Sequence, residues 1–225
     1  MPRKENATIL NASYGTRKVP HHEQQYEFTC GPASLMMIFK HFDKKFALTN
    51  QAETDIWRES SLAPLPPTSR YGLAFSALKR GYHVEILTNV KGIEYVSKTP
   101  ASLTGRRTGD FFESFLDMMK AQFDERKKRA FELGLKERIV KKFSSAEVVS
   151  VLERKGLSIM LTSARFFDDQ DWAHWVVLTG CDSENVYIND PASATKKGYR
   201  VFSKAKFEEI NNYYGDQVLI PIFRK

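Results

Sequence analysis

The chain has 225 residues, 42% hydrophobic and 12% aromatic, a composition typical of a folded globular protein and not of a disordered one. Its 34 basic and 27 acidic residues give a net charge of +7, which permits an acidic partner without identifying one. The sequence contains no run of about 18 apolar residues, so we expect no membrane span. The N-terminal segment has no apolar core that would indicate a Sec signal peptide, and we expect retention in the cytoplasm.

The sequence contains only two cysteines, Cys30 and Cys181. Neither lies in a CxxC motif or at a metal-ligand spacing from histidine, so we expect no metal site. No Gly-rich phosphate loop, HExxH motif or GxSxG motif is present, and we expect no cofactor. A chain of this size does not need a disulfide, which favours a reducing compartment.

Helices dominate the first half of the predicted structure. Residues 1–19 are expected to form an arm or an edge strand. An apolar run opened by Gly-Pro predicts a helix from Cys30 to about residue 42. Pro64, Pro66 and Pro67 predict a loop. The remaining elements expected here are helices over 49–61 and 68–82 and a strand over 83–90.

Strands dominate the second half. The spacing of apolar residues predicts a helix over 110–134, stopped by Gly134, within a helical elaboration that covers 110–142. The sequence Ser144-Ser145-Ala146-Glu147 is typical of a capping box. It opens a helix over 145–156, followed by a strand over 157–165, a hairpin of strands 174–182 and 185–191, a helix over 203–213 and a strand over 217–225. Helices followed by an antiparallel sheet indicate the α+β class.

A first block, residues 24–37, carries a candidate nucleophile. Cys30 stands at the start of a predicted helix, where the local dipole favours a thiolate that can attack a carbonyl. Gln24 precedes it by six positions in an extended segment. Its side-chain amide could stabilise an oxyanion beside the Cys30 backbone N–H. A small buried cysteine and a solvent-exposed amide are the structural alternatives for these two residues.

A second block, residues 174–191, carries a candidate base and its partner. His174 opens an apolar strand and could serve as general base and then as general acid. Asp190 follows the second strand of the predicted hairpin, so the two residues should meet at its open end. There the carboxylate could orient the imidazole. A structural histidine and an ordinary Asp-Pro turn are the alternatives.

These two blocks resemble the C39-like family of papain-fold cysteine peptidases, in its stand-alone form. The resemblance rests on Glu23-Gln24, on Phe28–Ala33, on His174–Val177 and on Asp190-Pro191. It implies a papain-like α+β fold with an N-terminal helical lobe packed on a C-terminal antiparallel sheet. It also implies Gln24 as oxyanion donor, Cys30 as nucleophile, His174 as base and Asp190 as orienter. We therefore expect residues 1–225 to form a single C39-like domain.

The family's exporters cleave leader peptides after Gly-Gly. This chain has no transporter segment and no nucleotide-binding motif, so that specificity is not carried over.

The expected function is a cysteine peptidase that cleaves a peptide or amide bond through a thioester. Two alternatives stay open, an acyl transferase that uses the same site and a non-catalytic papain-fold binding module. The basic stretch 125–142 raises a third, nucleic-acid binding, but no nucleic-acid motif accompanies it and we expect none. A peptide or protein substrate is the expected partner.

Overall fold

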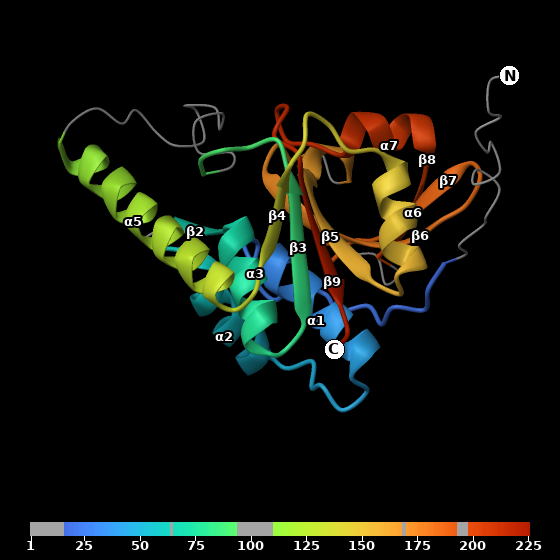
Figure 1. Ribbon diagram of the computed structural model, residues 1–225, viewed down its shortest axis with the longest axis horizontal. Helices are drawn as coiled ribbons and strands as arrows, with labels where there is room; N and C mark the ends of the chain where they lie inside the picture. Colours follow the sequence, from blue (N-terminus) through green and yellow to red (C-terminus); the bar gives the residue numbers. More distant parts are fainter. Residues whose placement is uncertain (1–15, 64, 94–109, 168–169, 193–197) are drawn as a thin grey trace, which may run out of the picture.

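The computed structural model describes residues 16–63, 65–93, 110–167, 170–192 and 198–225. Figure 1 shows its central sheet, with α1 behind the sheet and α6 in front of it. The sheet has seven strands in the order β4-β3-β9-β5-β6-β7-β8. The predicted strand in the N-terminal arm falls outside the described residues. At the end of the arm, the Arg17 backbone N–H donates to the Thr179 carbonyl at 2.9 Å.

The first half of the chain folds into the predicted helices. Thr49 caps the second helix by accepting from the Ala52 N–H, and Ser69 caps the third by accepting from the Gly72 N–H. The elements of this half are α1 (Cys30–Phe42), α2 (Asn50–Ser60), α3 (Arg70–Lys79) and β3 (His83–Thr88).

The proline-rich connection between α2 and α3 differs from the prediction of a loop. Strand β2 (Leu65–Thr68) contains Pro66 and Pro67 and pairs antiparallel with β1 (Ser61–Leu62). Proline tolerates extended backbone where no partner strand needs its missing N–H. A two-stranded sheet has only edge strands, so the prolines fit it.

The predicted helical elaboration over 110–142 is helical only in part. Helix α5 (Asp110–Glu132) stands away from the sheet, as Figure 1 shows. Gly134 has a positive φ of 93° and follows the helix end, as predicted. Residues after it are extended as β4 (Lys136–Ile139), which pairs parallel to β3. The sequence pattern did not predict β4 because its residues are mostly charged. The strand lies at the edge of the sheet, where charged side chains are tolerated.

The second half supplies most of the sheet. The predicted capping box is present, since Ser144 accepts from Ala146 N–H and the Glu147 carboxylate accepts from Ser144 N–H. The elements of this half are α6 (Ser145–Glu153), β5 (Leu157–Ser163), the 3₁₀ turn η1 (Ala164–Phe166), β6 (Ala173–Cys181), β7 (Asn185–Asn189), β8 (Tyr199–Ser203), α7 (Lys204–Ile210) and β9 (Val218–Phe223).

Strand β9 is an interior strand, third from the β4 edge of the sheet. It pairs antiparallel with β3 on one side and with β5 on the other. Strand β5 also pairs antiparallel with β6, and β6 forms the predicted hairpin with β7. In this register Thr162 lies opposite His174, and Val177 lies opposite Asn189. The candidate base therefore lies at the start of β6, close to the end of β7.

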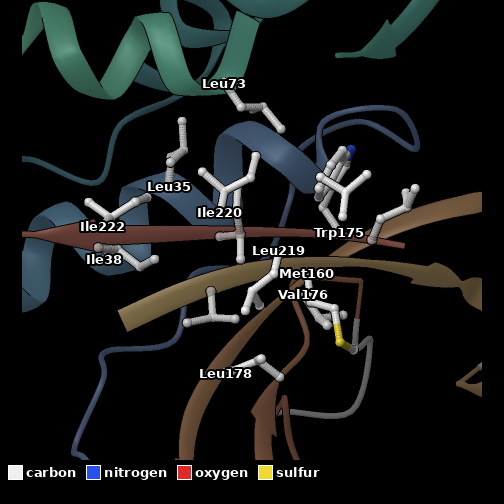
Figure 2. Packing of buried hydrophobic residues seen from close by; sticks show 14 of the residues in the cluster. Leu35, Ile38, Leu73, Met160, Trp175, Val176, Leu178, Leu219, Ile220 and Ile222 are labelled. Carbon is white, nitrogen blue, oxygen red and sulfur yellow. The ribbon is translucent and has the colours of Figure 1, made fainter. Parts of the chain in front are cut away.

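The core lies between the sheet and the helices on its two faces. Every residue of β5 is buried, which requires cover on both faces of that strand. Figure 2 shows Leu35 and Ile38 from α1 and Leu73 from α3 in one cluster with Ile220 from β9. The structure therefore has the predicted α+β fold, but β3 and β4 of the helical half belong to the same sheet.

Among the helices in the described ranges, none is long and apolar enough to cross a membrane.

Candidate active site

The first turn of α1 positions the candidate nucleophile. The helix begins at Cys30, and Pro32 lies in its first turn, where its missing N–H removes no hydrogen bond. This turn contains no acidic residue, so its free N–H groups and its dipole favour a negative charge on the sulfur. The Cys30 side chain lies at the surface of the core, with 6% of the residue exposed.

A hydrogen bond one turn later fixes α1 against the strand that carries the candidate base. The buried Ser34 hydroxyl donates to the Trp175 carbonyl at 3.1 Å. Because Trp175 follows His174 directly, this contact fixes the point along β6 at which the N-terminus of α1 lies. Residue Trp175 itself is 2% exposed and belongs to the core. The packing of α1 on the sheet thus sets the position of Cys30 relative to His174.

The imidazole of His174 lies between Asp190 and Cys30. Its Nε2 and the Asp190 Oδ1 are 2.8 Å apart, and Cys30 is close enough for its interaction with the ring to raise the pKa of His174. Since Nε2 is taken by the carboxylate, Nδ1 is the nitrogen available to the sulfur. The Ala192 backbone N–H donates to the same Asp190 oxygen at 3.0 Å. The Phe167 ring packs edge-on against the imidazole at 5.7 Å.

The charged forms of this pair are stabilised in the folded protein. Burial alone would lower the pKa of His174, but its hydrogen bonds to Asp190 and Cys30 raise it to about 10. Burial alone would raise the pKa of the Asp190 carboxyl, but the hydrogen bond and charge of His174 lower it. The imidazole is therefore cationic near neutral pH and faces both an anionic oxygen and the sulfur.

The predicted oxyanion donor Gln24 is connected to the residue before the nucleophile. Its side-chain nitrogen donates to the Tyr26 carbonyl at 2.8 Å. The same carbonyl accepts from the backbone N–H of Thr29 at 3.0 Å and from its hydroxyl at 2.9 Å. An amide nitrogen carries two hydrogens, so a second N–H of Gln24 remains for another acceptor.

One backbone contact and one side-chain contact join the Gln24 segment to the residues on either side of Asp190. The Gln24 N–H donates to the Pro191 carbonyl at 2.9 Å. The Asn189 side-chain oxygen is 2.8 Å from Nδ1 of His21. These contacts place Gln24 beside the end of β7, and so on the side of the site where Asp190 meets His174. The structure thus brings His174 against Asp190 and close to Cys30, and it joins the backbone of Gln24 to Pro191, the residue after Asp190.

Sequence reasoning missed a buried carboxylate near this segment. Glu53 on α2 has no exposed surface and contacts both His22 and the Gln25 backbone. A signal was available, because Glu53 shares one face of α2 with the buried Ile56 and Ser60. A carboxylate on a buried face requires a specific partner.

The arrangement can carry out acyl transfer on chemical grounds. A sulfur nucleophile contacts a cationic imidazole, and a carboxylate orients that imidazole from its other nitrogen. The backbone N–H groups at the N-terminus of α1 and the Gln24 side-chain amide are donors of the kind that stabilises an oxyanion.

Comparison with known proteins agrees with this geometry. The sequence profile described as the Peptidase_C39 like family matches residues 19–207, which include every residue of the site. The chain belongs to the Peptidase_C39 like family. Among proteins of curated function, no relative of this sequence was found.

Solved structures support the fold. A crystal structure from Bacillus anthracis, described as that of a C39-like peptidase, matches with a TM-score of 0.53 and 14% sequence identity. The alignment covers 96% of this chain and 99% of the other. A double glycine motif protease from an AMS/PCAT transporter, in complex with the leader peptide, matches with a TM-score of 0.48 and 16% identity, over 94% and 95% of the two chains. The first of these likenesses shows that this C39-like family member has the papain-like α+β fold.

Proposed function

We propose that this member of the C39-like family is a cysteine peptidase that cleaves a peptide or amide bond through a thioester. The single observation that carries the proposal is the buried His174 ring, which binds Asp190 through Nε2 at 2.8 Å and whose pKa is raised by its interactions with Asp190 and Cys30. A histidine held between a sulfur and a carboxylate has the contacts that a thiol nucleophile and its base require.

In the proposed reaction the Cys30 thiolate attacks the scissile carbonyl, a C–S bond forms and the carbonyl oxygen becomes anionic. The Gln24 amide and the Cys30 backbone N–H stabilise this oxyanion. The His174 imidazolium gives its proton to the leaving amine as the C–N bond breaks. Neutral His174 then takes a proton from water, which attacks the thioester and releases the acid. Asp190 keeps the ring in one orientation through both steps.

We also propose that the described elements form one domain, with the N-terminal arm and α5 as additions to it. Strand β9 supports this proposal, because it pairs with β3 of the first half and with β5 of the second. Neither half has a complete sheet without the other.

The first experiment measures the reactivity of the two cysteines towards iodoacetamide by intact-mass spectrometry. Wild type is compared with Cys30→Ala and His174→Ala across about pH 5–9, a range that brackets an ordinary thiol. Fast single alkylation below neutral pH should be lost in Cys30→Ala and should slow about tenfold or more in His174→Ala.

Cys181 serves as the internal control. It is fully buried, and burial raises the pKa of its thiol, so it should react slowly. Cys181→Ala should leave the fast phase unchanged. If alkylation is slow at all pH values, or occurs mainly at Cys181, the proposal fails and a non-catalytic binding module becomes the better hypothesis.

A further inference from the structure

The buried side chain of Glu53 lies on the inner face of α2. The residue has no exposed surface, and an ionised carboxylate in such a place is costly unless hydrogen bonds compensate it. Its neighbours on that face are the apolar Ile56 and the small Ser60. The partners of this carboxylate therefore decide what it does.

Both oxygens of Glu53 bind the segment that carries Gln24. Oε2 lies 2.8 Å from Nε2 of His22, and Oε1 accepts from the backbone N–H of Gln25 at 2.8 Å. His22 and Gln25 stand on either side of Gln24 in the sequence. One carboxylate thus holds both ends of a short segment against α2.

The same segment is also held by the strand end that carries Asp190. The Gln24 N–H donates to the Pro191 carbonyl at 2.9 Å, and His21 contacts the Asn189 side chain. Gln24 therefore lies in a segment that has two supports, α2 and the end of β7. Within the described part of the chain, the hydrogen bonds to these supports are made by the backbone of Gln24 and by its neighbours His21, His22 and Gln25, and not by the Gln24 side-chain amide.

The side chain of Gln24 depends on these supports for its position. Its nitrogen makes one hydrogen bond, to Tyr26, two residues away in the same segment. Its Oε1 is buried and has no hydrogen-bond partner in the described part of the chain. A movement of the segment would therefore move the amide with it, because among the described residues no hydrogen bond ties the amide to another element.

We propose that Glu53 is a positioning residue, which holds Gln24 at the place where its amide stabilises the oxyanion. The proposal rests on the proposed function, because it assigns Glu53 a role only through Gln24. Glu53 touches neither the substrate nor Cys30, and acts through the hydrogen bonds to His22 and Gln25.

Two reactions of Cys30 separate this role from a purely structural one. Acylation by p-nitrophenyl acetate passes through an oxyanion and releases p-nitrophenolate as the thioester forms. Alkylation by iodoacetamide displaces iodide from carbon and forms no oxyanion. A defect in the oxyanion donor should slow the first reaction and spare the second, whereas loss of folded protein slows both.

Glu53→Ala should lower the acylation rate about 10- to 100-fold, the scale expected when a catalytic group is displaced by about 1 Å. The alkylation rate should stay within about twofold of wild type, because Cys30 and His174 keep their contacts. Glu53→Gln should restore most of the acylation rate, because an amide of the same length can accept from Gln25 N–H and donate to His22.

Glu59 on the same helix provides the matched control. Its carboxylate is largely buried too, but its partners lie elsewhere, since it binds Ser76, Lys79 and Arg80 of the α3 region. Glu59→Ala should lower stability and leave the ratio of acylation to alkylation unchanged.

Addition of Gln24→Ala decides whether Glu53 acts through the amide. Gln24→Ala alone should slow acylation about 10²- to 10³-fold, as loss of an oxyanion donor does. In the Gln24→Ala background, Glu53→Ala should slow acylation by less than about a further twofold, since the effects of residues that act as one unit are not additive. A full additional loss in the double variant, or wild-type acylation in Glu53→Ala, overturns the proposal.

If Glu53→Ala does not fold, Glu53→Asp takes its place. Aspartate keeps the charge but shortens the reach by one methylene, so acylation should still fall while alkylation is kept. Unchanged acylation in that variant also overturns the proposal. Failure of the proposed function is a separate result, because wild-type Cys30 would then react slowly with both probes.

Discussion

At His174 and Asp190 two opposing effects act on the same buried pair. Burial disfavours a charged imidazole and a charged carboxylate, whereas their contact at 2.8 Å favours both. The second effect is larger for both groups, since the pKa of His174 is raised to about 10 and that of Asp190 is lowered. Folding is therefore accompanied by uptake of a proton at His174 when the pH lies between the ordinary pKa of histidine and the raised pKa in the folded protein.

This proton uptake predicts a pH-dependent stability. A pKa that is raised in the folded state stabilises the protein fully when the pH is below the unfolded-state pKa of 6.5. This stabilisation is lost as the pH rises through about 10. The free energy of unfolding of wild type, relative to His174→Gln, should thus be largest below about pH 6.5. Above that pH, this difference in the free energy of unfolding should decline by at most about 1.4 kcal/mol per pH unit. Urea unfolding of both proteins at several pH values measures the difference. A constant difference across this range contradicts the assignment.

The four candidate residues Gln24, Cys30, His174 and Asp190 stood out in the sequence because each lies in a short local pattern, and their catalytic roles stay a prediction. Cys30 precedes a helix with Gly-Pro at its start, and His174 and Asp190 flank a hairpin. Glu53 was missed because its partners His22 and Gln25 are distant in sequence and carry no motif. Its role follows only from the packing of α2 against the segment before Cys30.

Helices α2 and α3 pack so closely that their contact leaves no space for a side chain at Gly72. A Cβ at this position would lie 2.4 Å from the Ser60 carbonyl oxygen and 2.5 Å from its Cα. Backbone atoms cannot move aside as a flexible side chain can. A change of packing between these two helices would also reach Glu53, which lies two turns before Ser60 on α2.

Gly72→Ala is therefore expected to destabilise the protein. Overpacking costs about 1–3 kcal/mol, and the better helix propensity of alanine offsets about 1 kcal/mol of it. Gly92→Ala is the control, because a Cβ there meets nothing within 4 Å, and it should change stability by less than about 0.5 kcal/mol. Urea unfolding of both variants gives the comparison. A Gly72→Ala protein as stable as wild type would show that the two backbones are further apart.

At the scale of elements, the sequence predicted what local patterns determine. The capping box that begins at Ser144 and the hairpin were predicted and are present. Strands β4 and β8 were missed because they are short, and exposed positions interrupt their pattern. Their backbones are extended because a neighbouring strand pairs with them, and that neighbour is distant in sequence.

Across the whole molecule, β9 joins the two halves of the chain. The strand was predicted from its apolar run, but its place in the sheet was not. Pro221 favours an edge position because it has no N–H to donate, yet β9 lies between β3 and β5. The order of strands in a sheet depends on contacts between distant segments, which a local pattern does not contain.

Removal of β9 should abolish folding. Burial of Val218, Leu219, Ile220 and Ile222 contributes about 1.5–3 kcal/mol for each side chain. Their sum is comparable with the whole stability of a typical domain, about 5–15 kcal/mol. A chain that ends at Gln217 should show no cooperative unfolding by circular dichroism, whereas a chain that ends at Phe223 should unfold like wild type. A cooperative transition in the shorter chain would mean that the sheet closes without β9.

The central position of β9 also has a consequence for biosynthesis. Strands β3 and β5 leave the ribosome before β9 exists, and the edges that will face β9 stay unpaired until it has been made. Such apolar edges are binding sites for any free strand. In crowded polysomes, the β9 segment of one nascent chain can enter the gap in another, which yields strand-exchanged dimers. Chaperone demand during synthesis should therefore be concentrated in the interval between the emergence of β5 and that of β9.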